Sequence, residues 1–233
     1  MRTLVFAERR QAGMLLAARI ADLVRAHPEM TDPLVLALPR GGVPVALEVA
    51  RRLPAPLDLL MVRKIGVPWQ PELAAAAVVE GEHPQIVVNE EVVAAVGMTE
   101  AELNAGKARE LAEIERRRGV YLAGRKPVPI EGRDVIVVDD GIATGATTRA
   151  ALRGVRRRHP RSLTLAIPVA PPETLDLLRQ EVDHLVCLEA PDFFRAIGAY
   201  YNDFTQVSDG EVVAMLHEAE RFAPANRPEH EPD

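Results

Sequence analysis

Short apolar runs alternate with longer stretches of helical periodicity in the first part of the chain. The runs 34–38 and 57–62 have the length of strands, and the first of them ends at a proline. The stretches 13–27 and 43–53 place their apolar residues at helical spacing, which predicts two helices. A strand, a helix and a strand within about 30 residues are typical of a parallel crossover unit.

The same alternation returns in the second half of the chain. We predict a helix that runs to Arg158, a helix near 172–180, and strands at 135–138, 162–169 and 184–190. This order favours an α/β fold with a mostly parallel, twisted sheet flanked by helices. A chain of 233 residues, 48% of them hydrophobic, suits one elaborated domain, which we expect over residues 1–221.

The segment 63–97 breaks this alternation and predicts an insert. Its first part, RKIGVPWQPEL, contains two prolines and a glycine, which predicts a long loop. The stretches AAAAVVEG and PQIVVNEE then predict a pair of short antiparallel strands. Thr99 and Glu102 form a capping-box pattern that opens a charged helix running to about Arg118.

The C-terminal part is first irregular and then helical. Residues 190–206 gather much of the scarce aromatic content, and Ser208 with Glu211 predicts the start of a final helix. Residues 222–233 have the composition of a disordered, solvated tail.

The charge of the chain limits its partners. Its 28 basic and 34 acidic side chains give a net charge of −6, which disfavours nonspecific binding to nucleic acid or acidic membranes. The basic run from Arg153 to Arg161 falls at the end of a predicted helix, where cations complement the helix dipole. A solvated helix end therefore explains this run better than a nucleic-acid site does.

Cysteine and histidine usage excludes several classes of site. Cys187 is the single cysteine, so it cannot form an internal disulfide, and its apolar neighbours indicate a core position. The six histidines lack the spacing of zinc ligands, and no serine lies in a G-x-S-x-G setting. No run of about 18 apolar residues predicts a membrane span, and the charged N-terminus does not resemble a signal peptide. We therefore expect a cytoplasmic location.

The stretch VIVVDDGIATGATTRAAL, residues 135–152, carries the strongest indication of chemistry. Its strand ends on Asp139 and Asp140, at the edge where ligands bind in parallel α/β folds. The loop that follows brings backbone N–H groups and threonine hydroxyls to a helix N-terminus, which suits a phosphate. The adjacent carboxylates suit the vicinal hydroxyls of a sugar, and ribose 5-phosphate combines both groups. The alternative is that the two acids only cap a turn.

This stretch resembles the PRPP-binding motif of the type I phosphoribosyltransferases, where PRPP is 5-phosphoribosyl-1-pyrophosphate. Neither a Walker A loop nor a dinucleotide fingerprint fits it, because the required lysine and glycine positions are absent. The resemblance implies that Asp139 and Asp140 hold the ribose hydroxyls and, indirectly, Mg²⁺. It assigns the 5′-phosphate to a loop made of Ala143, Thr144, Gly145, Ala146, Thr147 and Thr148.

The stretch LPRGGVPVA, residues 38–46, resembles the pyrophosphate loop of the same family. It follows a predicted strand, and Gly41 and Gly42 would let backbone N–H groups approach an anion. The resemblance places Arg40 directly after an unusual cis peptide bond with Pro39. An ordinary strand-to-helix turn is the alternative.

The insert begins where these enzymes carry a mobile loop that closes over the active site. The resemblance assigns Arg63 and Lys64 to the pyrophosphate, whose charge requires cations and Mg²⁺. Loop closure would also exclude water from the activated sugar. The alternative is that both side chains are the solvated ends of a strand.

The aromatic segment falls near the hood of the family, where an aromatic side chain often stacks on a nucleobase. Phe193 and Phe194 are the candidates for that contact. The alternative is that these rings, with Tyr200 and Tyr201, only pack against the C-terminal helix.

The chain as a whole also resembles a bacterial group of phosphoribosyltransferases without an assigned acceptor, over about residues 1–217, from the AERRQAG start to the AIGAYYNDFTQVSDGEV ending. Enzymes acting on 6-oxopurines typically place an acidic general base where this chain has Ala143, so that substrate class is disfavoured.

Our leading hypothesis is Mg²⁺-dependent transfer of the phosphoribosyl group from PRPP to a nitrogen nucleophile, such as a nucleobase, with release of pyrophosphate. Asp139, Asp140, Arg40 and Lys64 would be its catalytic residues. The rival hypothesis is a non-catalytic PRPP or nucleotide sensor that regulates a partner. Dimers are common in the family, which makes a homodimer an expectation.

Overall fold

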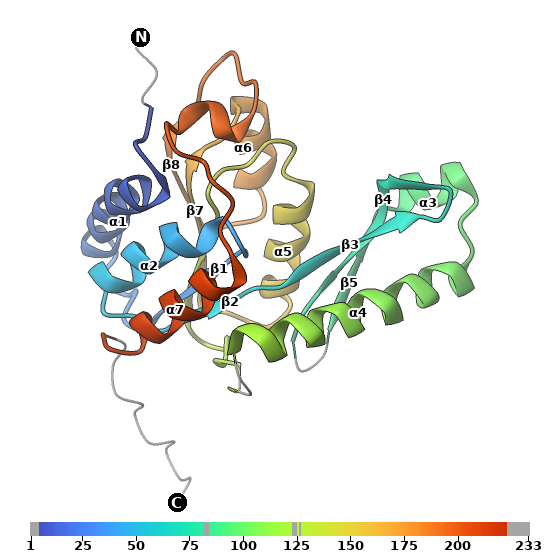
Figure 1. The fold of residues 1–233 in the computed structure, drawn as a ribbon, viewed down its shortest axis with the longest axis horizontal. Helices are drawn as coiled ribbons and strands as arrows, with labels where there is room; N and C mark the ends of the chain where they lie inside the picture. The colour runs from blue at the N-terminus through green and yellow to red at the C-terminus, as the bar shows by residue number, and fades with distance from the viewer. Residues whose placement is uncertain (1–4, 82–83, 123–124, 126, 223–233) are drawn as a thin grey trace, which may run out of the picture.

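A five-stranded parallel sheet forms the centre of the molecule (Figure 1). The computed structural model describes residues 5–81, 84–122, 125 and 127–222. The strand order is β2-β1-β6-β7-β8, and every neighbouring pair is parallel. The strands are β1 Pro33–Ala37, β2 Leu57–Leu59, β6 Asp134–Val138, β7 Ser162–Val169 and β8 His184–Glu189. The parallel α/β sheet that the alternation predicts is confirmed.

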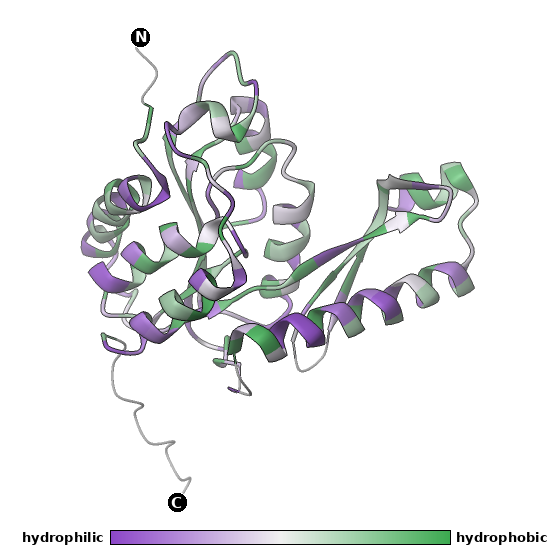
Figure 2. Cartoon of the chain, in the orientation of Figure 1, coloured by the Kyte–Doolittle hydropathy of each residue, from purple (hydrophilic) through white to green (hydrophobic). Residues whose placement is uncertain are grey.

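Both faces of this sheet are apolar and covered by helices. Along β1 and β6, alternate side chains point to opposite faces, as the two-residue period of a strand requires. Val35 and Ile136 are buried in one core cluster, and Leu36 and Val137 in the other. Figure 2 shows these strands largely in the hydrophobic colour, the pattern expected when a parallel sheet is buried on both sides.

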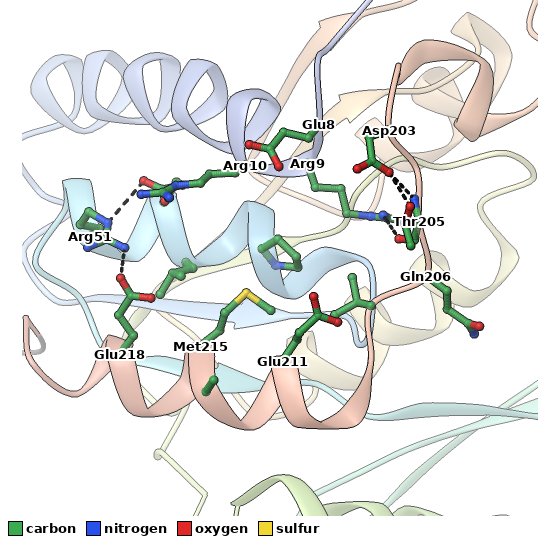
Figure 3. Close-up of a pocket in the computed structure, with 15 residues that line it drawn as sticks. Glu8, Arg9, Arg10, Arg51, Asp203, Thr205, Gln206, Glu211, Met215 and Glu218 are labelled. Carbon is green, nitrogen blue, oxygen red and sulfur yellow. Dashed lines mark hydrogen bonds and ion pairs between the residues drawn. The ribbon is translucent and has the colours of Figure 1, made fainter.

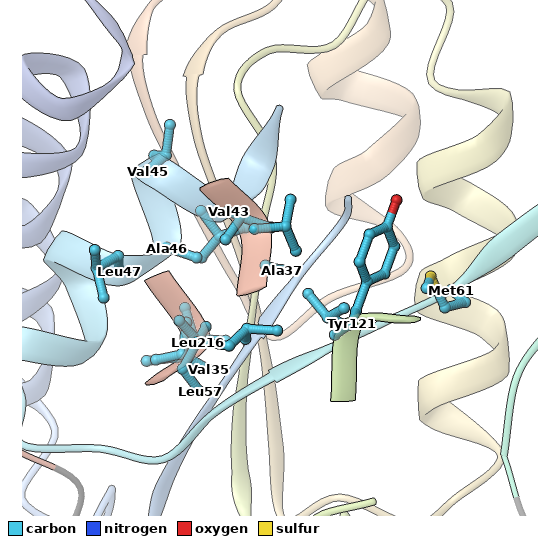
Figure 4. Close-up of a cluster of buried hydrophobic side chains, with 14 of the residues drawn as sticks. Val35, Ala37, Val43, Val45, Ala46, Leu47, Leu57, Met61, Tyr121 and Leu216 are labelled. Carbon is cyan, nitrogen blue, oxygen red and sulfur yellow. The ribbon is translucent and has the colours of Figure 1, made fainter. Parts of the chain in front are cut away.

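The flanking helices divide between these two clusters. Figure 4 shows Leu216 of one helix beside Val35, and Val43 of another helix near Ala37, all within the first cluster. The first cluster includes side chains of α1 Arg9–Ala26, α2 Gly42–Arg52 and α7 Asp209–Ala219, together with Ile114, Tyr121 and Leu122 from a helix of the arm described below. The second cluster includes side chains of α5 Ala146–Arg156 and α6 Pro172–Arg179. The capping box predicted at the start of α7 is present, between Ser208 and Glu211.

A second, antiparallel sheet and two helices form an arm that projects away from the parallel sheet (Figure 1). The elements of the arm are β3 Val62–Val67, β4 Gln70–Val79, β5 Gln85–Val88, α3 Glu90–Val96 and α4 Glu100–Leu122. The antiparallel strands predicted from AAAAVVEG and PQIVVNEE are confirmed as parts of β4 and β5. The charged helix is confirmed as α4, and Glu102 accepts a hydrogen bond from the Thr99 N–H, at 2.8 Å.

The long loop predicted at the start of the insert is wrong, because β3 and β4 pair as a hairpin there. Pro68 lies in the turn, where its missing N–H costs no ladder hydrogen bond. Gly66 lies at a shift in the strand register, which is where a strand tolerates glycine. Turn and bulge residues thus accompany a continuous hairpin here instead of a loop.

Helix α3 was not predicted, although both of its ends carry sequence signals. The Asn89 side chain accepts a hydrogen bond from the Val92 N–H at 3.3 Å and caps the start. Gly97 ends the helix in the left-handed region, with φ at 63°. The helix is short, so its apolar residues do not establish a period that separates it from a strand.

Ion pairs gather at the amino ends of the parallel strands. Arg153 contacts Glu181 at 2.7 Å and Arg156 contacts Asp183 at 3.0 Å. Arg161 pairs with the buried carboxylate of Asp134, at the start of β6. These residues of the basic run therefore form ion pairs within the chain. They lie at the sheet edge opposite the loops that follow β1 and β6.

The segment 190–206, which we call the hood, is held to the start of the chain. Phe6 and Tyr201 form a parallel β-bridge, and the Asn202 N–H donates to the Phe6 carbonyl oxygen at 2.8 Å. The predicted tail, 222–233, lies outside the described residues apart from Phe222. None of the helices in the described part of the chain is long and apolar enough to cross a membrane.

Candidate functional site

The loops that follow β1 and β6 meet at the carboxyl edge of the parallel sheet. The Leu38 N–H donates to the Val138 carbonyl oxygen at 2.9 Å, which extends the pairing of the two strands to this edge. Asp139 and Asp140 follow directly, so the sheet places both acids where ligands bind in such folds.

Asp139 is the more accessible of the two acids. Its side chain is half-buried, and one carboxylate oxygen accepts a hydrogen bond from the Asp140 N–H at 2.8 Å. Burial, and then the neighbouring charge of Asp140, raises the pKa of Asp139 well above its ordinary value. Hydroxyl donors or a cation at this carboxylate would therefore be favoured.

Asp140 is buried and already has a partner. Arg9, at the start of α1, donates from Nε to the carboxylate at 2.7 Å, and each side chain is 11% exposed. The Tyr201 hydroxyl donates to the Asp140 carbonyl oxygen at 2.5 Å. Burial raises the pKa of Asp140, against the opposing charge of Arg9. The two acids expected to act alike thus have unequal surroundings.

Arg9 is a site residue that sequence reasoning missed. It lies 131 positions from Asp140, and no local pattern connects the two. The available signal was the AERRQAG start, which belongs to the similarity with the bacterial group but indicates no role.

The proposed phosphate loop leads into a helix start with open donors. Gly145 is in the left-handed region with φ at 75°, and no side chain caps α5. The first backbone N–H groups of this helix are orphan donors suited to an anion. The loop residues Ala143, Thr144 and Ala146 are exposed, and Gly145 and Thr147 are partly exposed. Thr148 is buried, at 3% exposure, so its side chain lies away from the open mouth of the loop.

Two contacts hold this loop in place. The Ile142 N–H donates to the Val169 carbonyl oxygen at 2.9 Å, and the Thr174 hydroxyl donates to the Ala143 carbonyl oxygen at 2.7 Å. Thr174 belongs to α6, about thirty residues further along the chain, and sequence reasoning gave it no role.

The loop after β1 lies against the acids. The Pro39–Arg40 peptide bond is cis, as the resemblance implies. A Cβ added at Gly41 would lie 2.0 Å from Oδ2 of Asp140, and one added at Gly42 would lie 2.7 Å from the Val138 carbonyl oxygen. These glycines are needed for close packing at the site, and the Gly42 N–H donates to the Leu38 carbonyl oxygen at 3.1 Å.

Arg40 points from this loop toward the start of α7. Its guanidinium lies 3.4 Å from Oδ1 of Asp209, which also accepts a hydrogen bond from the Tyr121 hydroxyl at 2.8 Å. The Arg40 side chain is 30% exposed. Because the contact with Asp209 is long and the side chain is partly exposed, the charge of Arg40 stays accessible to a ligand.

Arg63 and Lys64 point to opposite faces of the arm sheet. Arg63 donates to Glu110 of α4 at 3.0 Å. Lys64 is exposed and lines a cavity of about 400 Å³ together with Ala146 and Thr147 of α5. The structure therefore brings Lys64, but not Arg63, beside the proposed phosphate loop.

The aromatic side chains of the hood have different partners. Phe194 stacks on Tyr200 with ring centroids 5.5 Å apart, and Tyr201 lies 5.3 Å from Phe6. Their cluster also contains Val169 and, within the described residues, nothing from α7, so the alternative that these rings only pack against the C-terminal helix is wrong. Phe193 is 91% exposed and free to contact a ligand.

A cavity of about 390 Å³ adjoins the site between α1, α2, α7 and residues 203–207 (Figure 3). Arg9 borders it, and Arg51 and Glu218 form an ion pair of 2.6 Å across its far end. The lining mixes acidic and basic side chains with an apolar floor that includes Met215.

Cys187 has no features of a nucleophile. It is half-buried on β8 and donates to the Glu189 carbonyl oxygen at 3.1 Å. Burial raises the pKa of its thiol to about 11, so the thiol is protonated at neutral pH.

Comparisons with known proteins find similarity over most of the chain. Residues 8–205 match the family model described as phosphoribosyl transferase domain. Rv0571c of Mycobacterium tuberculosis (strain H37Rv), provisionally named a phosphoribosyl transferase, is 45% identical over 222 residues, which are 95% of this chain and 48% of that protein. The chain thus spans about half the length of the curated relatives it matches. The crystal structure of TT1426 from Thermus thermophilus has 42% identity and a TM-score of 0.79, covering 92% of this chain and 99% of that one.

Proposed function

The chain belongs to the phosphoribosyl transferase domain family, and on that premise we propose that it transfers the 5-phosphoribosyl group of PRPP to a nitrogen nucleophile. Pyrophosphate is released, and Mg²⁺ is bound together with PRPP. The acceptor is a nucleobase or a related heterocycle, and the 6-oxopurines are disfavoured because Ala143 supplies no base.

One observation carries this proposal: one short loop joins a half-buried carboxylate with a raised pKa to an uncapped helix start. Asp139 suits the hydroxyls of the ribose, because charge-assisted hydrogen bonds offset the cost of its burial. The open N–H groups of α5 suit the 5′-phosphate. A sugar phosphate held at both ends keeps C1 in a fixed place while its bond to pyrophosphate breaks.

The acids fit a magnesium ion that is bound mainly through the substrate. Among the described residues, no group of three or more His, Cys, Asp or Glu side chains could hold a metal. Asp139 and Asp140 supply two carboxylates, and Mg²⁺ commonly takes one or two carboxylates with substrate oxygens and water. When bound, it would neutralise part of the charge of the pyrophosphate.

The cations of the site take separate roles in this proposal. Arg40, in the loop next to Gly41, is placed to stabilise the departing pyrophosphate. Lys64 lies beside the phosphate loop and would add charge at that side of the substrate. Phe193, exposed on the hood, is available to stack on a planar acceptor.

Calorimetric titration with PRPP and Mg²⁺ tests the binding half of the proposal. We expect Asp139→Asn to weaken PRPP binding at least about tenfold, because the hydroxyls lose a charged acceptor. Asp176→Asn is the matched control, since Asp176 is 80% exposed on α6, and its affinity should stay within about twofold. Full affinity in the Asp139→Asn variant would contradict the assignment.

Pyrophosphate release over a panel of nucleobases and heterocyclic amines tests the transfer half. Turnover with one acceptor supports the transferase. PRPP binding without turnover on any acceptor would support the rival, a sensor that shares the same contacts.

A further inference from the structure

Arg9 makes three kinds of contact at the site. Its Nε donates to Oδ2 of Asp140 at 2.7 Å, and its Nη1 donates to the Thr205 carbonyl oxygen at 2.8 Å. Its guanidinium carbon lies 3.8 Å from the ring centroid of Phe204, a cation–π contact. One side chain thus touches the acidic doublet and the hood at the same time.

The backbone at Gly41 also confines the Asp140 carboxylate. The approach of Gly41 is so close that an added Cβ would lie 2.0 Å from the oxygen that Arg9 contacts. Arg9 and Gly41 therefore fix one orientation of this carboxylate. That orientation leaves the half-buried Asp139 as the acid with room for a ligand.

The hood depends on the same segment of chain. The Phe6 N–H donates to the Tyr200 carbonyl oxygen at 2.8 Å, and the Asp203 N–H donates to the Ala7 carbonyl oxygen at 2.9 Å. Arg9 lies two residues after Ala7 and adds a side-chain contact to Asp140, beside the one that the Tyr201 hydroxyl makes to the Asp140 carbonyl oxygen. The start of the chain, the hood and the acids consequently form one connected unit.

We propose that Arg9 is a positioning residue of the site, which holds the Asp140 carboxylate and the hood in a single arrangement with the ribose side left to Asp139. The inference rests on the proposed function for its ligand. Arginine suits this role better than lysine, because a planar guanidinium donates in two directions while stacking on a ring.

The neighbouring Arg10 provides a matched control. It is 63% exposed and pairs with Glu48 of α2 at 3.0 Å, whereas Arg9 pairs with Asp140. The experiment compares wild type with Arg9→Gln, Arg9→Lys, Arg10→Gln, Asp140→Asn and the double variant Arg9→Gln/Asp140→Asn. The readouts are calorimetric affinity for PRPP with Mg²⁺, melting temperature, and hydrogen exchange of the amides of Asn202 and Asp203.

We expect Arg9→Gln to weaken PRPP binding about tenfold and to speed exchange at both hood amides, while Arg10→Gln changes neither by more than about twofold. Arg9→Lys should recover part of the affinity, because it retains the charge but not both directed donors. The double variant should bind PRPP no more weakly than the weaker of the two single variants, since both break the same contact.

Three results would overturn the inference. The first is equal PRPP affinity and hood exchange in the Arg9→Gln and Arg10→Gln variants, and the second is a loss of affinity in the double variant that equals the product of the two single losses. The third is a lowered melting temperature of Arg9→Gln with unchanged PRPP affinity, as expected of a merely structural arginine. If wild type itself fails to bind PRPP with Mg²⁺, the proposed function fails. The hold of Arg9 on the hood is then decided by hydrogen exchange alone, where faster exchange in Arg9→Gln than in Arg10→Gln supports it and equal exchange refutes it.

Discussion

At the scale of single residues, the site depends on close approaches between segments distant in sequence. Gly41 faces the Asp140 carboxylate with no room for a Cβ, and Arg9 meets the same carboxylate from α1. A carboxylate that is enclosed in this way keeps one orientation, and the neighbouring Asp139 is then the acid with room for a ligand. Small residues here therefore matter as much as charged ones.

Gly41→Ala tests this enclosure. The new methyl group would displace the Asp140 carboxylate, so we expect the free energy of unfolding to fall by about 1–3 kcal/mol and PRPP affinity to fall with it. Urea unfolding and calorimetry measure the two effects. Gly210→Ala is the control, because an added Cβ there meets nothing within 4 Å, and a Gly41→Ala protein that matches it would refute the enclosure.

The sequence could reveal only those site residues that lie together in one continuous stretch. Asp139, Asp140 and the loop through Thr147 lie within a few positions, and their order along strand, loop and helix fixes their place at the sheet edge. Arg9 and Thr174 reach the site only through tertiary packing, so no local pattern predicts them. Thr148 shows the reverse case, since it belongs to the motif but is buried.

At the scale of elements, the sequence predicted the parallel sheet, the β4–β5 pair and α4, but not the β3–β4 hairpin or α3. Buried parallel strands are continuous apolar runs, which stand out between amphipathic helices. In the arm, Pro68 and Gly66 occupy a turn and a bulge, and composition alone does not separate such a hairpin from a loop. The alternation of Arg63 and Lys64 between two faces follows only once the strand is known.

Helix α4 packs against β3 of the arm through Gly106, and one added methyl group there should disturb this packing. A Cβ on Gly106 would lie 2.5 Å from Cγ2 of Ile65 on β3. We expect Gly106→Ala to lower the free energy of unfolding by about 1–3 kcal/mol in urea, although alanine alone favours a helix. Gly119→Ala, on the same helix with open space around it, should be neutral or stabilising.

The double variant Gly106→Ala/Ile65→Ala sharpens this test. Removing the Ile65 side chain makes room for the new methyl group, so the double variant should lose less stability than the sum of the two single variants. Additive losses would show that Gly106 is not in contact with Ile65.

At the scale of the whole molecule, the two ends of the parallel sheet have different electrostatic roles. β6 begins at the buried Asp134, which pairs with Arg161, and ends at the acids of the site. Burial acts to raise the pKa of Asp134, but hydrogen bonds from Arg161, the Asp32 N–H and Ser162 outweigh it and hold the pKa below its ordinary value. At Asp139 and Asp140 burial prevails and the pKa is raised. The charges at the amino edge of the sheet thus stabilise the fold. The carboxylates at the carboxyl edge are costly to ionise, and a bound ligand would offset that cost.

Asp134→Asn should lower the free energy of unfolding by about 1–3 kcal/mol at pH 7, a value reduced because Arg161 is partly in solvent. A carboxyl group whose pKa is lowered by folding stabilises the protein above its unfolded pKa of about 3.9, and this stability is lost as the pH falls through the folded pKa. The difference between variant and wild type, measured by urea unfolding, should therefore shrink below about pH 4. PRPP affinity at pH 7 should stay within about twofold of wild type, and a large loss would mean that the two edges are not independent.

The turn between β3 and β4 places the chain's single tryptophan, Trp69, at the outer end of the arm, with 61% of it exposed. Intrinsic fluorescence of this protein consequently reports on the outer end of the arm and not on the proposed site at the carboxyl edge of the parallel sheet. Emission excited at the indole band will stay constant while a small molecule fills the sheet edge, and will shift only when something docks onto that extremity.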